Sequence, residues 1–368
     1  MVIGTDLNRQ SELKAFDDTK AGVKGLVDAG VKKLPNIFIH QQDNEDKNTV
    51  TDSPGEVNSR AIPTINLHGF SADPVAQSSI VGKIREACET WGFFQAVNHG
   101  IPVNVLDEMM DGMKRFHELD NEVKKQMYTR DPSRKVKFVS SFDLFQTPTA
   151  SWRDTFACDM APVPPDAQLV PEICRDIVFK FSEHIMEFTT KIMELISEGL
   201  GLNPDHLKYH NCSQSLLVMG HYYPACPEPE LAMGTLTHRD SGVLAIVLQD
   251  QISGLQVEYE NRWFDITPVP GALIVNIGDL LQLMSNGKLK SVNHRVVSKR
   301  IGPRISVACL LRSEGATIGN VPRVFGPFQE LISEDCQPVY RNITLTEYHA
   351  KKYSKGLNGS SVLDHFKL

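Results

Sequence analysis

The sequence contains no run of 18 or more apolar residues, the minimum for a membrane-spanning helix. Its first residues, MVIGTDLNRQSELK, include no apolar stretch, so we expect no secretory signal. A basic excess is also missing, because 38 Lys and Arg face 45 Asp and Glu, for a net charge of −7. Nucleic-acid binding usually requires a basic stripe. We therefore expect neither a membrane nor a nucleic acid as a partner.

Cysteine is sparse, and its pattern excludes a disulfide framework. Seven cysteines are scattered over 368 residues, their number is odd, and none forms a C-x-x-C pair. Such usage is typical of free thiols in a reducing compartment, so we expect a cytoplasmic protein. No sequence signal indicates an oligomer, and we take a monomer as the default.

Two histidines and an aspartate stand out among the polar residues. His238 and Asp240 lie two positions apart in GTLTHRDSGVLAIVLQD, and in an extended strand such positions project to the same side. His294 follows much later, in LKSVNHRVVSKR. Two imidazoles and one carboxylate form the facial triad typical of non-haem Fe(II) oxygenases. This triad leaves positions open for O2 and a chelating co-substrate.

A second polar pair, Arg304 and Ser306, lies in the apolar, strand-like run GPRISVACLLR. A guanidinium binds a carboxylate through two parallel hydrogen bonds, and a neighbouring hydroxyl can add a third. Upstream, HYYPACPEPELAMG can place Tyr223 near the same pocket. An open iron site beside this clamp predicts a dicarboxylate co-substrate, with one end on the metal and the other on Arg304. Because a buried charge that loses its partner is costly, we expect Arg304→Ala to abolish co-substrate use.

Several segments, in this order along residues 15 to 355, resemble the plant 2-oxoglutarate- and Fe(II)-dependent dioxygenases. The N-terminal segment 15–40 narrows the resemblance to the clade of 1-aminocyclopropane-1-carboxylate oxidase homologues, which includes alkaloid and benzoxazinoid hydroxylases. The other matching segments are IPTINL (62–67), WGFFQAVNHGIP (91–102), YYPACPEPE (222–230), HRD (238–240), NHRV (293–296) and PRIS (303–306).

The resemblance implies a reaction and a set of roles. The reaction couples O2 and 2-oxoglutarate to oxidation, most often hydroxylation, of a substrate C–H bond, with ascorbate as reductant. By clade, the substrate would be a plant specialised metabolite such as an alkaloid, a steroid-like or a phenolic compound. Fe(II) would be bound by His238, Asp240 and His294, and 2-oxoglutarate by Arg304, Ser306 and Tyr223.

The sequence departs from the family pattern at two positions. The residue before YYP is usually Asn, which helps to orient the co-substrate, and here it is His221. This imidazole could replace the amide or take no part. The residue between the first two ligands is usually Thr, and here it is Arg239. Strand alternation predicts that Arg239 points away from the metal. Whether it reaches the substrate or a surface carboxylate is open at this stage.

Three functions other than a 2-oxoglutarate-dependent dioxygenase are compatible with parts of this pattern. Zinc accepts the same three ligands, but a zinc hydrolase needs a general base beside its metal-bound water, no H-E-x-x-H helix is present, and the carboxylate clamp would have no use. A true 1-aminocyclopropane-1-carboxylate oxidase would use ascorbate and bicarbonate in place of 2-oxoglutarate. A non-catalytic jelly roll that only binds a small molecule is the third alternative.

Hydrophobic patterning predicts a mainly β protein with flanking helices. From 213 to 312, short apolar runs alternate with turns, which indicates an antiparallel sandwich or barrel. With the triad placed on it, we expect a double-stranded β-helix, or jelly roll. We predict a mobile tail (1–14), a region of helices and strands packing on the core (15–210), the jelly-roll core (211–320) and a closing segment (321–368).

The wall of the substrate pocket is less constrained. Met219 precedes His221 and Tyr223 by two and four positions, and Leu310 follows Arg304 and Ser306 at even spacing, so each shares a strand face with its polar neighbours. Family likeness adds three aromatic residues from the segment 130–151. Each of the five could equally be ordinary core. The expected wall residues are Met219, Leu310, Phe138, Phe142 and Phe145.

Overall fold

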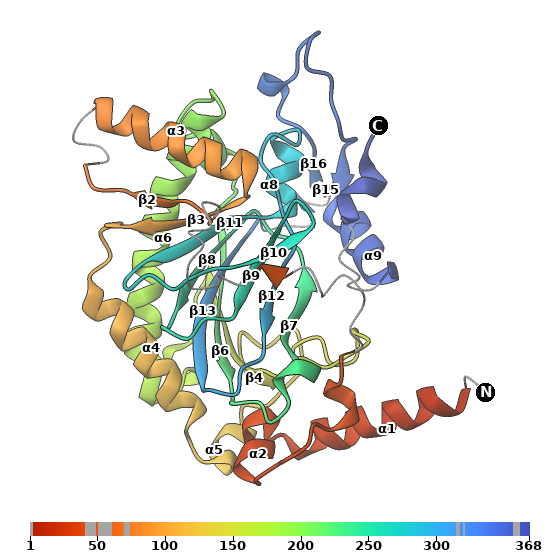
Figure 1. Ribbon diagram of the computed structural model, residues 1–368. Coiled ribbons are helices and arrows are strands. Elements are labelled where there is room, and N and C mark those ends of the chain that lie inside the picture. The colour runs from red at the N-terminus through yellow and green to blue at the C-terminus, as the bar shows by residue number, and fades with distance from the viewer. Residues whose placement is uncertain are drawn as a thin grey trace.

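A computed structural model describes residues 3–40, 49–50, 61–69, 74–313, 317–318, 321–355 and 361–368. Two β-sheets face each other, and helices flank them (Figure 1). The prediction of a mainly β protein with a jelly-roll core is confirmed.

The larger sheet has eight strands in the order β2-β3-β11-β8-β13-β6-β5-β4. Its centre consists of long antiparallel pairings of β13 with β6 and with β8. The strands are β2 (Thr64–Asn66), β3 (Phe93–Val97), β4 (Val136–Ser140), β5 (Asp154–Ala161), β6 (Ser215–Tyr223), β8 (Leu244–Gln249), β11 (Leu273–Ile277) and β13 (Arg304–Arg312).

The smaller sheet has five strands in the order β1-β10-β9-β12-β7. Its edge pair, β7 and β12, is antiparallel and places His238 directly opposite His294. The strands are β1 (Thr49–Val50), β7 (Met233–His238), β9 (Leu255–Tyr259), β10 (Arg262–Asp265) and β12 (His294–Val297).

Three helices lie against one side of the larger sheet (Figure 1). They are α3 (Pro74–Thr90), α4 (Val103–His117) and α6 (Glu172–Gly199). α6 buries one apolar stripe, which includes Phe181 and Phe188. The apolar residues of this stripe recur every three or four positions, and they pack against the outer face of the sheet. α5 (Asn121–Lys125) and α7 (His206–Tyr209) are short.

The N-terminal residues form α1 (Ile3–Thr19) and α2 (Gly22–Asp28), although we predicted a mobile tail over 1–14. Leu13 is fully buried in a second apolar cluster with Phe16, Phe38 and Trp152. The sequence-based prediction weighed only the polar character of this segment. It missed that a single leucine, one turn before Phe16, can fix the helix.

The C-terminal part contains α8 (Asp279–Met284) and α9 (Leu345–Lys355), and α9 lies within the segment 321–368. The Tyr348 hydroxyl of α9 donates a hydrogen bond to Asp279 Oδ2 (2.6 Å). Two small sheets pair β14 with β15 and β16 with β17. Their strands are β14 (Thr317–Ile318), β15 (Val321–Pro322), β16 (Val324–Phe325) and β17 (Ile343–Thr344). Short 3-10 helices span Asn36–Phe38, Ala167–Leu169, Pro229–Leu231, Gln329–Leu331 and Val362–Phe366.

Strands β4 and β5 were not predicted. They nevertheless extend the larger sheet beyond β6. Polar residues in the runs KVKFVSS and DTFACDMA hide the apolar alternation. The predicted boundary at residues 210 and 211 therefore divides one continuous sheet. Most of the predicted flexible loop, 41–61, lies outside the described residues.

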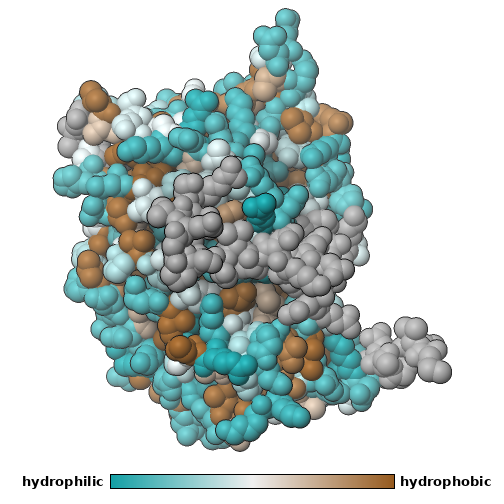
Figure 2. Space-filling view, in the orientation of Figure 1, coloured by the Kyte–Doolittle hydropathy of each residue, from teal (hydrophilic) through white to brown (hydrophobic). Residues whose placement is uncertain are grey.

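On the face seen in Figure 2, hydrophobic side chains are interspersed with hydrophilic ones. Among the described helices, none is both long enough and apolar enough to cross a membrane.

The aromatic cluster that anchors the N-terminal segment gives a stability prediction. Phe38 is fully buried, and its ring centroid lies 5.2 Å from that of Phe16 and 5.0 Å from that of Trp152. Phe38→Ala should lower the free energy of unfolding by about 3–5 kcal/mol, because it leaves a cavity in a packed cluster. Urea unfolding measures this loss. The exposed Leu169→Ala should stay within about 0.5 kcal/mol of the unmodified protein, and equal effects of the two changes would contradict the packing described.

Candidate metal centre and co-substrate pocket

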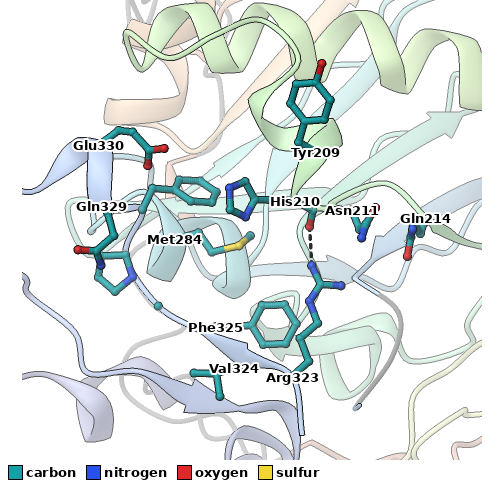
Figure 3. Close-up of a pocket in the computed structure, with 13 residues that line it drawn as sticks. Tyr209, His210, Asn211, Gln214, Met284, Arg323, Val324, Phe325, Gln329 and Glu330 are labelled. Carbon is teal, nitrogen blue, oxygen red and sulfur yellow. Dashed lines mark hydrogen bonds between the residues drawn. The ribbon is translucent and has the colours of Figure 1, made fainter. Parts of the chain in front are cut away.

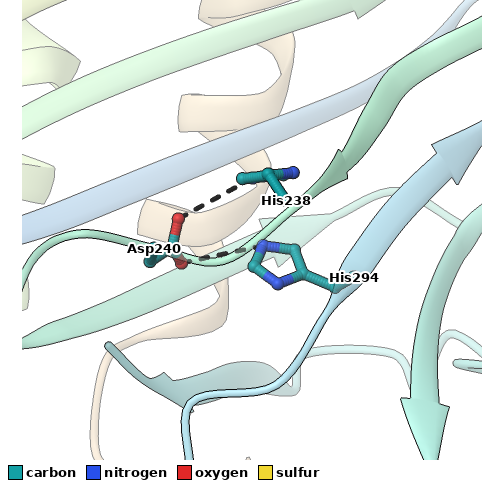
Figure 4. A group of neighbouring side chains, drawn as sticks. All are labelled: His238, Asp240 and His294. Carbon is teal, nitrogen blue, oxygen red and sulfur yellow. Dashed lines mark ion pairs between the residues drawn. The ribbon is translucent and has the colours of Figure 1, made fainter. Parts of the chain in front are cut away.

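The end of β7, the turn after it and the start of β12 bring His238, Asp240 and His294 together (Figure 4). Asp240 Oδ1 lies 3.7 Å from His238 Nε2, and Asp240 Oδ2 lies 3.7 Å from His294 Nε2. One donor atom from each residue lies within 4.8 Å of the other two. Asp240 lies in the turn after β7 and not in the strand itself, and this turn brings its carboxylate to the rings of His238 and His294.

The hydrogen bonds of both rings suit metal binding. His238 Nδ1 donates to the carbonyl of Leu236 (2.9 Å), and His294 Nδ1 donates to the carbonyl of Val292 (3.2 Å). A protonated Nδ1 leaves the Nε2 lone pair of each neutral ring free to face Asp240. Burial, with the neighbouring His294, lowers the pKa of His238 to about 3, which keeps this ring neutral.

Residues of β11 and α8 hold Asp240 in place. Asn276 Nδ2 donates to Asp240 Oδ2 (2.8 Å), and the backbone N–H of Asp279 donates to the carbonyl of Asp240 (2.7 Å). A Cβ on Gly278 would lie 2.2 Å from the carbonyl oxygen of Gly242, so only glycine permits this approach. Burial opposes ionisation of Asp240, but the two imidazoles and Asn276 outweigh it and lower the pKa of the carboxyl.

The carboxylate clamp predicted from the sequence lies on β13. Arg304 is 2% exposed, and its Nη2 and Nε donate to Gln249 Oε1 (2.8 Å) and to the carbonyl of Ile252 (3.1 Å). Its Nη1 lies 3.4 Å from Ser306 Oγ. Within the described residues Arg304 has no ion pair, because the nearby Asp250 carboxylate accepts from backbone N–H groups. A buried guanidinium without a carboxylate is a site prepared for one.

Tyr223 and His221 of β6 lie beside Arg304 and Ser306 across the β6–β13 pair. The Arg304 guanidinium lies 5.1 Å from the centre of the Tyr223 ring. The Tyr223 hydroxyl lies 3.3 Å from Oγ1 of Thr235 on β7. This face of the larger sheet therefore looks toward the smaller sheet, and the clamp and the triad share one compartment.

His221 stays neutral in this compartment. Burial, with the charges of Arg153 and Arg304, lowers its pKa well below the usual value. Its Nδ1 lies 3.0 Å from Thr155 Oγ1 of β5, which fixes the ring. A neutral, fixed imidazole can take the place of the amide that relatives of this pattern carry at this position.

Comparison with known proteins agrees with this geometry. Residues 214–313 match the 2OG-Fe(II) oxygenase superfamily, and residues 62–174 match the N-terminal region of non-haem dioxygenases in morphine synthesis. The chain is 48% identical to 1-aminocyclopropane-1-carboxylate oxidase homolog 1 of Arabidopsis thaliana, over 98% of this chain and 97% of that protein. The chain belongs to the 2-oxoglutarate- and Fe(II)-dependent oxygenases.

Other similar proteins widen the comparison for this oxygenase. Deacetoxyvindoline 4-hydroxylase of Catharanthus roseus is 47% identical, over 97% of this chain and 89% of its own. The crystal structure of JOX2 in complex with 2OG, Fe and JA superimposes with a TM-score of 0.79 at 27% identity, covering 94% of this chain and 97% of JOX2. A rice dioxygenase for auxin oxidation shares the fold, with a TM-score of 0.70 at 22% identity, covering 84% of this chain and all of that one.

The five expected wall residues of the oxygenase divide into two groups. Met219 and Leu310 lie together in a small apolar cluster with Ala157, Leu217 and Ala308, on the face that carries the clamp. Phe138 lies on the opposite face, where it packs against Phe116 in the main core, so it does not reach this compartment. Phe142 and Phe145 follow β4, are 37% and 45% exposed, and do not belong to the cluster.

The reason for the difference is the register of β4. Phe138 pairs with Phe156 of β5, and both face the helices, whereas Lys137 pairs with Ala157 and faces the compartment. The sequence did not reveal β4, so the presence of aromatic residues alone could not show which face of the sheet Phe138 occupies.

A cavity of about 750 Å³ lies elsewhere in the oxygenase and contains none of the predicted site residues. His210, Phe325 and Phe328 line it, and Arg323 Nη2 donates to the carbonyl of His210 (2.5 Å; Figure 3). It contributes nothing to the compartment between the sheets.

Sequence reasoning left the role of Arg239 open, and the structure places its side chain on the outer side of the triad. Arg239 Nε donates to Asn293 Oδ1 (3.1 Å), and Nη1 donates to the carbonyl of Ser291 (2.8 Å). Its own carbonyl lies 3.5 Å from Lys352 Nζ of α9. Arg239 thus connects the segment that carries His238 and Asp240 with the segment that leads into His294.

This connection predicts a positioning role in metal binding. Arg239→Ala should weaken Fe(II) binding about 10- to 100-fold, as is usual when groups that orient metal ligands are lost. Anaerobic titration of the metal-free protein with Fe(II) measures the affinity. Arg85→Ala, which removes an exposed arginine paired with Glu89 on α3, is the matched control. Equal Fe(II) affinity in the two variants would show that Arg239 does not position the ligands.

Proposed function

We propose that this oxygenase binds Fe(II) through His238, Asp240 and His294 and holds the distal carboxylate of 2-oxoglutarate with Arg304, Ser306 and Tyr223. The observation that carries the proposal is the buried Arg304 guanidinium, which has no ion pair in the described part of the chain and faces the same compartment as the triad. Together these groups suit a ligand that chelates a metal at one end and carries a carboxylate at the other.

The residues around this pocket bind and orient the metal and the co-substrate. His238 and His294 turn their Nε2 atoms toward Asp240 because their Nδ1 atoms donate to backbone carbonyls. The neutral His221 offers its second ring nitrogen to the co-substrate. Iron, when bound with 2-oxoglutarate, supplies the reduction of O2 and the oxidation of a substrate C–H bond. Met219 and Leu310 form an apolar wall for the substrate and exclude water from the reacting atoms.

The substrate is a small plant specialised metabolite, and hydroxylation is the proposed outcome. The 47% identity to a deacetoxyvindoline 4-hydroxylase over almost the whole chain supports a hydroxylation of this kind. Ascorbate serves as the reductant that keeps the iron ferrous. The seven cysteines, all free, support a cytoplasmic location, and a monomer stays the default.

The proposed function predicts turnover of the co-substrate. With Fe(II), ascorbate and O2, the protein should convert 2-oxoglutarate to succinate, and a plant metabolite extract should stimulate this conversion. His294→Ala removes one imidazole ligand and should abolish both activities. Succinate measured by mass spectrometry decides the result. Oxidation of 1-aminocyclopropane-1-carboxylate with ascorbate and bicarbonate, without succinate, would favour the oxidase alternative. Fe(II) binding with no 2-oxoglutarate decay under any condition would favour the non-catalytic binder.

The second prediction concerns the hydroxyl of Tyr223. Tyr223→Phe should raise the KM for 2-oxoglutarate about tenfold or more, because a hydrogen bond to a charged group contributes roughly 1.5–3 kcal/mol. The turnover number at saturation should change less. Tyr222→Phe is the matched control, since the Tyr222 hydroxyl bonds to Glu118 on the opposite face of the same strand. A KM shift of the same size in both variants would remove Tyr223 from the co-substrate site.

A further inference from the structure

A second buried arginine lies beside the co-substrate pocket. Arg153 immediately precedes β5 and is 7% exposed. Asp154 pairs with Tyr222, so strand alternation places Arg153 on the face that carries Tyr223 and Arg304. Its Nη1 donates to Thr235 Oγ1 across the compartment (2.9 Å), the same hydroxyl that lies 3.3 Å from the Tyr223 hydroxyl.

Arg153 lacks an anionic partner. Over the described ranges it forms no ion pair, and its Nε is buried without a hydrogen bond. The neighbouring Asp154 carboxylate points to the other face, where it accepts from the backbone N–H groups of Val23 and Lys24 (both 2.8 Å). An uncompensated buried charge costs several kcal/mol, so this arginine favours an anion that binds beside it.

The co-substrate does not supply that anion. One Fe(II), the Asp240 carboxylate, the Arg304 guanidinium and dianionic 2-oxoglutarate are together electrically neutral, and His238 and His221 are uncharged. Arg153 then remains as a positive charge in excess.

The charge of Arg153 affects the neighbouring Tyr223. Burial would raise the pKa of Tyr223, yet Arg153 and Arg304 lower it below the usual value. Tyr223 lies between the two arginines, on the strand that separates β5 from β13. An anion at Arg153 would therefore lie beside the distal carboxylate of 2-oxoglutarate, on the β5 side. Ala157, Leu217 and Met219 would contact the rest of that molecule.

We propose that Arg153 binds a carboxylate of the substrate, so that the substrate is an apolar small molecule with an acidic group. This inference rests on the proposed function, because it assigns the substrate class of the same site. Substrates that reach the metal as neutral molecules would leave the Arg153 charge unbalanced.

The test uses the whole protein, loaded anaerobically with Fe(II) and 2-oxoglutarate. The visible charge-transfer band of this complex reports chelation, and its perturbation reports a second ligand. Two matched pairs serve as probes: benzoate with benzamide, and 1-naphthoate with 1-naphthamide. The acids should bind about 10- to 100-fold more tightly than their amides, as expected for hydrogen bonds to a charged group.

Three variants identify the responsible residue. Arg153→Gln should remove the preference for acids and should weaken 2-oxoglutarate binding much less, because Arg153 influences that co-substrate only through its neighbour Tyr223. Arg153→Lys, which keeps the charge and guards against a folding defect in the first variant, should retain part of the preference. Arg312→Gln alters an arginine of β13 that is already paired with Asp159 (2.6 Å) and should have no effect.

The outcomes separate this inference from the proposed function. Absence of the charge-transfer band in the unmodified protein would contradict the proposed function itself. A normal band with no preference for acids, or the same preference in Arg153→Gln, would overturn the inference alone. Loss of 2-oxoglutarate affinity in Arg153→Gln, as large as the loss of acid binding, would show that Arg153 only positions Tyr223.

Discussion

The antiparallel pairing of β7 with β12 is the constraint on which the rest of the site depends. It sets His238 opposite His294, although four strands (β8 to β11) and helix α8 separate the two residues along the chain. The turn after β7 then carries Asp240 to a point between the two rings. Asn276 and Gly278, from the segment that leads from β11 into α8, and Arg239, from the turn after β7, all act on this one junction. A change in the register of this pair would move one imidazole away from the other.

Electrostatics explains why the compartment between the sheets suits anions. Arg304 and Arg153 are buried there, and neither has an ion pair within the described ranges. A ligand that neutralises these charges offsets the cost of removing a guanidinium from water. The neutral histidines in the compartment leave the arginines as its main source of positive charge. The site is therefore arranged for a metal chelate and carboxylates, and apolar walls such as Met219 surround it.

Much of the fold and of the site could be predicted from the sequence, because these features depend on the spacing of residues that are close together along the chain. Alternation along an apolar run correctly placed Arg304 and Ser306 on one face, and the spacing of short runs predicted the jelly roll. The predictions for Phe138 and for residues 130–151 failed because the face of β4 depends on its pairing with β5, which local patterning does not reveal. The role of Arg239 depends on Asn293, a contact between distant segments. Arg153 went unnoticed for the same reason.

A comparison of 2-oxoglutarate with 2-oxobutyrate, which chelates the same way but lacks the distal carboxylate, tests the central claim most directly. Anaerobic titration of the Fe(II)-loaded protein should show a strong preference for 2-oxoglutarate, and Arg304→Gln should remove most of that preference while leaving 2-oxobutyrate binding intact. An unchanged preference in Arg304→Gln, or equal binding of both ligands by the unmodified protein, would contradict the account of one compartment shared by the triad and the clamp.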